Sequence, residues 1–420
     1  MSDRVVVVGG GLAGCEAALQ LANAGHDVTL LEMRPVRGTE AHQSENLGEL
    51  VCTNSFKSVH PKNAHGQLKR EMRALVSILL ACADETSVPA GSALAVDRQL
   101  FSGAMTRAVD SHPRIEVVRD ESEELPEGPA IVATGPLTSD ALSSAIQRAL
   151  GDEGLAFYDA IAPIVHRDSL DESVIFSAGR FEEDSDYLNC PMDEAEYLAF
   201  IEALLAGDVR EGPDWDAVPY FEGCLPIEVM ASRGEDTPRF GPMKPIGLID
   251  PRSGERPYAV VQLRREDRAG QMWNLVGFQT RLRTGAQKSV FQLIPGLEHC
   301  EFLRLGSIHR NAYLNFPACL TPHGSLEDRP DLIFAGQLTG VEGYTESAAS
   351  GILAGINLGR VLRGERPVVP PPTTMLGGLF RYLKESAPGH FQPMNSNWGL
   401  VDPLNRRVKD KVKKREMLAE

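Results

Sequence analysis

Four valines, Val5 to Val8, run directly into the glycine-rich turn Gly9-Gly10-Gly11-Leu12-Ala13-Gly14. A run of β-branched residues is typical of a parallel strand that is buried on both faces. The turn has the G-x-G-x-x-G spacing, in which the first two glycines allow close approach to a pyrophosphate and the last lets the next helix pack on the strand. The chain therefore begins with the predicted strand, turn and helix of a dinucleotide-binding fold.

The residues after the turn continue this pattern. A helix is expected from Cys15 to Ala24, and Gly25 ends it. Val28–Leu31 is the next expected strand, and Glu32 follows it where an acid accepts a ribose hydroxyl, roughly 20 residues beyond the turn. The motif alone does not separate NAD from FAD.

Composition limits the class of protein. The chain has 420 residues, which suggests two or three domains. It has neither a basic leader before Val5 nor an apolar run long enough for a membrane span, so we expect a cytoplasmic protein. Its seven cysteines lack metal-ligand spacing, which predicts reduced thiols and no metal site. Because the net charge is -16, an RNA partner must meet a local basic patch.

We expect an α/β protein with a Rossmann-like FAD-binding domain, of the two-dinucleotide-domain flavoprotein type, interrupted by an inserted α+β domain. Asp97 caps a predicted helix through Val109, and short strands are expected at 115–118 and 130–133. The expected division is 1–155 for the first part of the FAD-binding domain, 156–295 for the insertion, 296–365 for the second part, and 366–420 for a linker and helical tail. The clearest predicted helix of the insertion is 193–206.

The second half of the cofactor site is expected late in the chain. A strand within 331–337 ends at Gly336-Gln337, where an amide replaces the acid usual in such flavoproteins, and a helix follows from Ser347 to Leu362. We expect Gly351 and Ile352 to belong to the helix N-terminus that faces the flavin. Gly135 ends the earlier strand in a Thr-Gly-Pro turn. A second G-x-G-x-x-G is absent, which favours resident FAD, with NADH or NADPH visiting as reductant.

Several stretches together resemble one family, the folate- and FAD-dependent tRNA (uracil-5-)-methyltransferases. The likeness runs from Met1 to about Val412, and the segments that carry it are Leu50–Ser58, Gly223–Glu228, His309–Tyr313, Ala335–Tyr344 and Asn395–Leu400. The resemblance implies ribothymidine formation in the tRNA T-loop. It also implies that methylenetetrahydrofolate is the one-carbon donor and that reduced FAD is the source of hydride.

The resemblance implies that Cys224 is the nucleophile and that Cys52 lies beside the flavin, where it protects the ring or acts as a base. Uracil C5 is a poor nucleophile until a thiolate adds at C6, and cysteine is suited to that addition near neutral pH. We expect Glu228, four residues after Cys224, to be a solvated acid. The remaining cysteines are expected to be small buried hydrophobic residues: Cys15, Cys82, Cys190, Cys300 and Cys319.

His309 resembles the family histidine that stacks on the folate pterin. Tyr344 lies in the expected flavin turn, where it either stacks on folate or substrate or is an ordinary packed tyrosine. Two groups of basic residues are candidates for RNA binding. The insertion supplies Arg264, Arg265, Arg268, Arg281, Arg283 and Lys288, and the tail supplies the run from Arg406 to Arg415.

Three alternatives stay open at this point. The same chemistry could act on ribosomal RNA, the chain could be an NAD(P)H-dependent flavin oxidoreductase of a small molecule, or it could be a non-catalytic RNA-binding flavoprotein. The small-molecule oxidoreductase gives Cys224 no role. The non-catalytic flavoprotein leaves both Cys52 and Cys224 without a role. We favour a monomer, although no residue fixes the oligomeric state.

Overall fold

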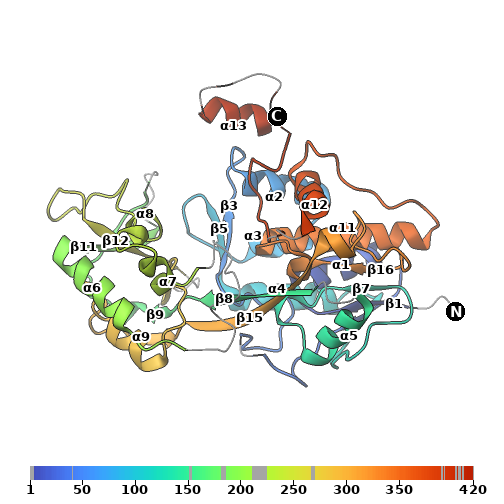
Figure 1. Ribbon diagram of the computed structural model, residues 1–420, viewed down its shortest axis with the longest axis horizontal. Coiled ribbons are helices and arrows are strands. Elements are labelled where there is room, and N and C mark those ends of the chain that lie inside the picture. The colour runs from blue at the N-terminus through green and yellow to red at the C-terminus, as the bar shows by residue number, and fades with distance from the viewer. Residues whose placement is uncertain are drawn as a thin grey trace.

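The computed structural model describes residues 4–39, 41–150, 154–180, 186–210, 225–265, 270–388, 391, 393–402, 404, 408 and 411–419, with backbone alone at 154–161, 307–312, 411, 412 and 414. The molecule has two halves (Figure 1). The two ends of the chain share one half and the middle of the chain forms the other. None of the described helices is long and apolar enough to cross a membrane.

A five-stranded parallel sheet forms the centre of the first half, in the order β16-β7-β1-β2-β6. Its strands are β1 Val5–Val8, β2 Val28–Leu31, β6 Ile115–Val118, β7 Ala130–Val132 and β16 Leu332–Phe334. Val7 lies opposite both Leu30 and Ile131, and all three side chains are fully buried. Burial on both faces explains why these strands are rich in β-branched residues, as predicted.

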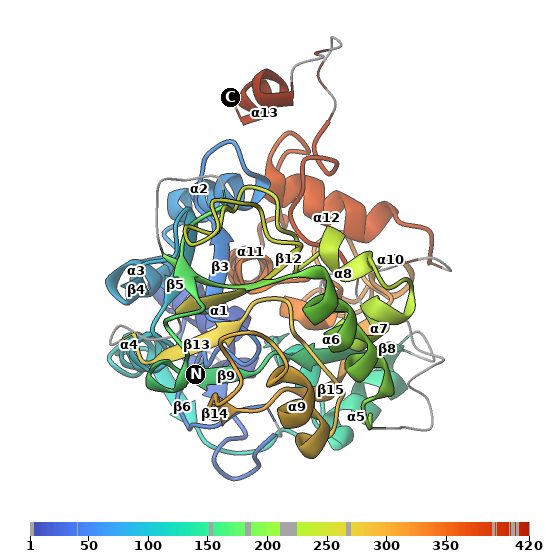
Figure 2. The same ribbon diagram turned by 90° about the vertical axis from the view of Figure 1, so that its left-hand side faces the viewer.

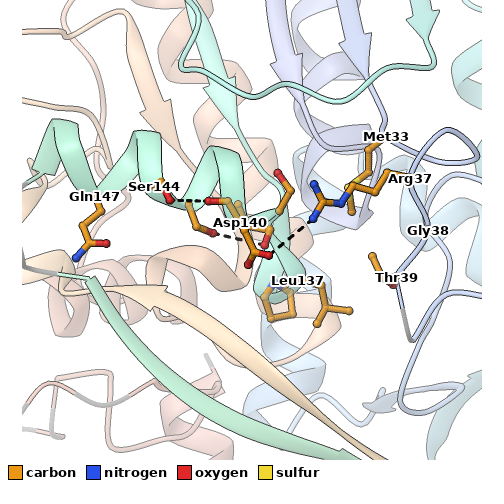
Figure 3. Close-up of a pocket in the computed structure, with 12 residues that line it drawn as sticks. Met33, Arg37, Gly38, Thr39, Leu137, Asp140, Ser144 and Gln147 are labelled. Carbon is orange, nitrogen blue, oxygen red and sulfur yellow. Dashed lines mark hydrogen bonds and ion pairs between the residues drawn. The ribbon is translucent and has the colours of Figure 1, made fainter.

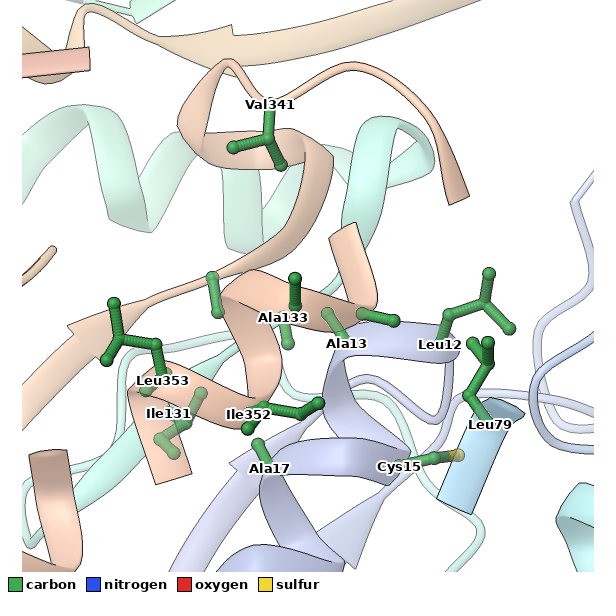
Figure 4. Close-up of a cluster of buried hydrophobic side chains, with 14 of the residues drawn as sticks. Leu12, Ala13, Cys15, Ala17, Leu79, Ile131, Ala133, Val341, Ile352 and Leu353 are labelled. Atoms are coloured by element: carbon green, nitrogen blue, oxygen red, sulfur yellow. The ribbon is translucent and has the colours of Figure 1, made fainter. Parts of the chain in front are cut away.

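Helices pack around this sheet, and the closest pair is α1 with α11 (Figure 4). The helices of this half are α1 Leu12–Asn23, α2 Ala64–Ala74, α3 Ile78–Glu85, α4 Arg98–Asp110, α5 Asp140–Leu150, α10 Phe316–Cys319, α11 Tyr344–Leu362, α12 Met375–Glu385 and α13 Lys411–Ala419. A small antiparallel sheet in the order β3-β5-β4 lies beside them, formed by β3 Ser55–Ser58, β4 Ser87–Val88 and β5 Ala93–Val96.

Local sequence signals set several helix ends. Asp97 accepts hydrogen bonds from the main-chain N–H groups of Gln99 and Leu100, which confirms the predicted cap of α4. Gly25 follows α1 with a φ of 95°, a conformation that favours glycine. In the second half, Asp193 and Glu196 form a reciprocal capping box at the start of α6.

The second half contains a six-stranded antiparallel sheet in the order β10-β11-β12-β13-β9-β14 (Figure 2). Its strands are β9 Ile164–His166, β10 Phe176–Ser177, β11 Tyr187–Met192, β12 Ala259–Arg265, β13 Met272–Leu275 and β14 Phe302–Arg304. Its helices are α6 Glu194–Ala206, α7 Ile227–Ser232, α8 Thr237–Phe240 and α9 Thr284–Phe291. An antiparallel ribbon of β8 Gly154–Ile161 and β15 Ser307–Leu314 runs between the halves.

Each half has its own hydrophobic core. The larger core joins residues from the first 146 positions with residues after 313, and the second core runs from Val165 to Phe302. The second core thus extends past 295, the expected end of the insertion. The domain boundaries given above stay predictions.

Candidate functional site

The turn after β1 has a geometry that only glycine permits at two of its positions. A Cβ atom at Gly14 would lie 1.8 Å from the carbonyl oxygen of Gly9, and one at Gly9 would lie 2.7 Å from that of Ala133. At Gly11, in contrast, a Cβ atom would meet nothing within 4 Å. Gly14 therefore allows α1 to pack on the turn, while Gly11 leaves open the space where a pyrophosphate fits.

Glu32 lies at the end of β2, as predicted, and is almost fully buried. Its Oε2 accepts the N–H of Gly10 at 2.9 Å, and its Oε1 accepts the main-chain N–H and the Nε of Arg34 at 3.0 and 2.8 Å. Burial alone would raise the pKa of Glu32, but the hydrogen bonds and charge of Arg34 hold it below its usual value. A carboxylate offers about four acceptor positions, so one on Oε2 is left for a ribose hydroxyl.

Sequence analysis missed Arg34, although its place two residues after Glu32 was available as a signal. Its guanidinium also donates to Glu49 Oε2 at 3.0 Å and to the carbonyl of Ser44 at 3.1 Å. Arg34 therefore fixes both the ribose acid and the loop that follows β2.

Two adjoining pockets form a trough that passes over Gly11. One pocket is lined at its far end by Glu32, Met33 and Asp120–Ser122, and the other by Gly336, Gln337, Tyr344 and Ser347. Gly11, His42, Thr134 and Leu137 line both. The trough therefore has an acid for the ribose at one end, open space over Gly11 in the middle, and the polar side chains of Gln337, Tyr344 and Ser347 at the other end. This order fits an extended dinucleotide. The residues present therefore fit FAD.

A further cavity of about 380 Å³ opens off the adenosine end of the trough (Figure 3). Arg37 points across it toward Asp140 at the start of α5, at 3.8 Å, and also donates to Glu121 at 2.6 Å. The cavity shares Met33 and Leu137 with the trough. We regard it as the solvent side of the adenosine pocket.

At the other end of the trough, α11 begins at Tyr344, earlier than the expected Ser347. Gly351 and Ile352 therefore lie about two turns into the helix and not at its N-terminus. A Cβ atom at Gly351 would lie 2.1 Å from the carbonyl oxygen of Ala13, and Ile352 is fully buried in the core (Figure 4). These two residues set the packing of α11 on α1, and the free N–H groups that face the trough belong to the turn starting at Tyr344.

Gly336 and Gln337 lie at the end of β16, as expected. Gly336 has a φ of 77° and its N–H donates to Ser350 Oγ at 2.6 Å, while Gln337 Nε2 donates to Glu342 at 3.0 Å. Gly135 also has a positive φ, 68°, and lines the same pocket. Gly135, Gly336 and Gln337 thus line one pocket, and their contact with the cofactor stays a prediction.

Cys52 and Tyr344 meet at this end of the trough, although 292 positions separate them. The Tyr344 hydroxyl lies 3.0 Å from Cys52 Sγ and accepts the main-chain N–H groups of Cys52 and Thr53 at 2.8 and 3.2 Å. Because these N–H groups occupy both lone pairs of the phenol oxygen, its own proton is directed at the sulfur. Burial and the neighbouring cysteine raise the pKa of Tyr344 well above its usual value, so the phenol stays a donor.

A buried carboxylate next to this pair was not foreseen. Glu346, in the first turn of α11, accepts the N–H of Ser396 at 2.9 Å and lies 3.2 Å from His65 Nδ1. Burial would raise its pKa, but the hydrogen bond from His65, the charges of Lys57 and His65, and the Ser396 N–H lower the pKa of Glu346 to about 2. Glu346 thus anchors the start of α11 to α2 and to the 395–397 segment.

Cys224 lies outside the described residues, so its position stays a prediction. Glu228, four residues later, was expected to be solvated, and this is wrong. It is 5% exposed, it accepts the Thr280 hydroxyl at 2.9 Å and the Arg281 N–H at 2.8 Å, and burial raises its pKa. Sequence could not reveal this, because both partners lie about 50 residues away.

The other cysteines are largely buried, as expected. Four are buried, and burial raises the pKa of each thiol, to about 11 for Cys82 and about 12 for Cys300. These four are Cys15, Cys82, Cys190 and Cys300. Cys319 is only half-buried.

The predicted RNA-binding arginines of the insertion differ in exposure. Arg264 is buried and donates to Asn54 Oδ1 at 3.0 Å and to Thr53 Oγ1, next to Cys52. Arg281 lies 3.7 Å from Glu228, and Arg283, which is exposed, lies 3.5 Å from Asp208.

The remaining candidates of this group are placed as follows. Arg265 lies over the Trp273 ring, 5.6 Å from its centroid, and Lys288 is exposed on α9. Arg268 is outside the described residues. His309 pairs with Asp159 in the ribbon between the halves, and its side chain is also outside the described residues.

The comparisons with known proteins agree with this geometry. The family described as "Glucose inhibited division protein A" matches residues 4–366. The chain is 54% identical over 414 residues to "Methylenetetrahydrofolate--tRNA-(uracil-5-)-methyltransferase TrmFO" of Geobacter sulfurreducens, covering 98% of this chain and 95% of that protein. It is 51% identical over 421 residues to the protein of the same name from Bacillus cereus (strain AH187), covering 100% and 97%.

Among solved structures, Aquifex aeolicus GidA in its form I crystal is similar with a TM-score of 0.73 and 16% identity, covering 99% of this chain and 74% of that one. The form II crystal gives a TM-score of 0.70 at 17% identity, covering 91% and 67%. At this identity the likeness shows a shared fold.

Proposed function

We infer the function from the premise that this chain belongs to the glucose inhibited division protein A family and, within it, to the methylenetetrahydrofolate--tRNA-(uracil-5-)-methyltransferases. The protein is an FAD-dependent enzyme that methylates C5 of a tRNA uridine with methylenetetrahydrofolate as the one-carbon donor. The finer assignments, the T-loop uridine and NADH or NADPH as the external reductant, are part of this proposal.

The observation that carries the proposal is the end of the trough where Cys52 meets Tyr344. The residues that line the trough from Glu32 over Gly11 to Tyr344 would hold FAD with its flavin at this end. When bound and reduced, FAD supplies the hydride that completes the methyl group. The chain's own residues must then activate the uracil and move its protons.

We assign the activation of uracil to the Cys224 thiolate. Its sulfur forms a bond to C6, which turns C5 into a nucleophilic carbon that attacks the methylene of the folate. Loss of the C5 proton and cleavage of the bond between the methylene carbon and the folate nitrogen release tetrahydrofolate and leave an exocyclic methylene on C5. Once that carbon has been reduced to a methyl group, the C6–S bond breaks and releases the thiolate. A thiol is suited to this role because it adds and departs readily near neutral pH.

We assign the removal of the C5 proton to Cys52. The Tyr344 hydroxyl points its proton at Sγ, which stabilises negative charge on that sulfur. Tyr344 also holds the loop, since it accepts two of its main-chain N–H groups, and Arg264 holds the next two side chains. Cys52 is thereby fixed as a base at the flavin end of the trough.

His309 and the exposed cations Arg283 and Lys288 complete the proposal as the folate and RNA contacts of the insertion side. The test is methylation of an unmodified tRNA transcript with methylenetetrahydrofolate and NADH, followed by digestion and mass spectrometry of the nucleosides. We expect 5-methyluridine that disappears when folate is omitted. Its formation on ribosomal RNA but not on tRNA would assign the alternative substrate.

A further inference from the structure

The segment from residue 57 to residue 73, which includes most of α2, is positively charged, whereas the protein as a whole is negatively charged. The whole chain has 58 acidic residues against 42 Lys and Arg, but this segment has a single acid, Glu71. Its basic residues are Lys57, His60, Lys62, His65, Lys69, Arg70 and Arg73. The local field here therefore attracts anions although the molecule as a whole repels them.

The one acid of this segment does not offset its positive charge at the surface. The Glu71 carboxylate accepts the main-chain N–H groups of Met375 and Leu376, at 2.8 and 2.9 Å, at the start of α12. Its charge is thus directed at the positive end of that helix. His60 and Arg70 of this segment are exposed.

The C-terminal helix α13 adds further cations to this side. Lys62 pairs with Glu416, and Arg70 donates to the carbonyl of Ala419 at 3.4 Å, so long side chains connect the 57–73 segment to α13, which lies above α2 in Figure 1. Lys413 and Arg415 of α13 are exposed. We call His60, Lys62, Arg70, Lys413 and Arg415 the α2–α13 surface.

This surface leads toward the catalytic end of the trough. His65, on α2, contacts Glu346 in the first turn of α11, two residues after Tyr344. In the insertion, Arg264 is buried, Arg281 and Arg283 lie near acids, and Lys288 is exposed. The α2–α13 surface adds exposed cations to those of the insertion.

We propose that the α2–α13 surface binds the phosphate backbone of the RNA substrate and orients the target uridine toward the site at Cys52. This inference rests on the proposed function, because it names where the substrate of that site is held. A lipid surface fits less well. Leu418 of α13 packs against the protein core, so this apolar side chain is not free to enter a membrane.

The test is the salt dependence of tRNA binding to the full-length protein. One variant combines Arg70→Gln, Lys413→Gln and Arg415→Gln. The matched control combines Arg4→Gln, Arg114→Gln and Arg148→Gln, which removes the same charge from exposed positions just before β1, just before β6 and on α5. Each lost phosphate contact lowers the slope of log K against log salt by roughly 0.7–0.9.

We expect the first variant to bind tRNA more weakly, with a slope lower by about 2 to 3 if all three cations contact phosphates, and the control to match the parent. FAD content should not change. An unchanged slope in the first variant overturns the proposal, and so does an equal fall in the control, which would show an effect of net charge alone.

Two further measurements separate the outcomes. If the parent binds tRNA but transfers no methyl group, the proposed function fails while the binding data still decide the surface. If the first variant loses binding to phosphatidylserine vesicles and keeps its tRNA affinity, the surface belongs to a membrane and the proposal is overturned.

Discussion

Substitution of Gly351 by alanine tests whether the contact between α1 and α11 sets the geometry of the cofactor site. A Cβ atom there would lie 2.1 Å from the Ala13 carbonyl oxygen and 2.7 Å from its Cα, whereas ordinary contact begins near 3.4 Å. Both atoms belong to backbone and cannot rotate away, so the helices must separate by roughly 1 Å in a close-packed interior.

Overpacking of this kind typically costs about 1–3 kcal/mol, and a contact with backbone belongs at the upper end. At about 2–4 °C per kcal/mol for a domain of some 200 residues, we expect the midpoint of thermal unfolding to fall by roughly 6–12 °C. The separation also moves the N-termini of both helices, which border the trough at Gly11 and Tyr344. FAD content after gel filtration should therefore fall as well.

The matched control is Gly103→Ala in α4, where the nearest atom to a new Cβ is Arg107 Nη1 at 3.4 Å. Alanine is favoured over glycine inside a helix by about 0.5–1 kcal/mol, so this variant should unfold at a slightly higher temperature and keep its FAD. Differential scanning fluorimetry and the flavin absorbance of both variants give the answer. A Gly351→Ala protein that matches the parent in both measurements would refute the reasoning.

Three further predictions concern single side chains. Cys224→Ala should retain FAD and its reduction by NAD(P)H but transfer no methyl group, and methylation near the parent rate would pass the role of nucleophile to Cys52. His309→Ala should raise the folate concentration needed for half-maximal rate by roughly three- to tenfold, since a lost ring stack costs about 0.5–1.5 kcal/mol; a shift in the RNA titration alone would place His309 on the RNA surface. Glu346 has a lowered pKa, so it stabilises the fold above its unfolded pKa, and this stability is lost as the pH falls toward about 2. Glu346→Gln should therefore lower the unfolding temperature at pH 7 more than at pH 3, and equal losses at both would contradict the ionised state.

Local rules account for the parts of the fold that the sequence predicted. The β1 turn, the cap at Asp97 and the capping box at Asp193 each depend on residues within a few positions of one another. The start of α11 was missed because Gly343 precedes it with a φ of 111° and no side-chain cap marks the helix.

Contacts between distant segments account for what could not be predicted at the site. The burial of Glu228 and Arg264 depends on partners about 50 and 210 positions away, to which no periodicity points. The resemblance named Cys52 and Tyr344, but only the structure shows that the phenol oxygen lies within hydrogen-bond distance of the sulfur and of two main-chain N–H groups of its loop.

The most direct test of the central claim follows the carbon atom itself. Methylenetetrahydrofolate with two deuterium atoms on its methylene is supplied to the enzyme with an unmodified tRNA transcript in ordinary water, and the nucleosides are weighed by mass spectrometry. If this chain transfers the folate methylene and completes it with hydride from reduced FAD, the methyl group of the 5-methyluridine retains both deuterium atoms. A product methyl group without deuterium would contradict the account, because its carbon would then have come from another donor.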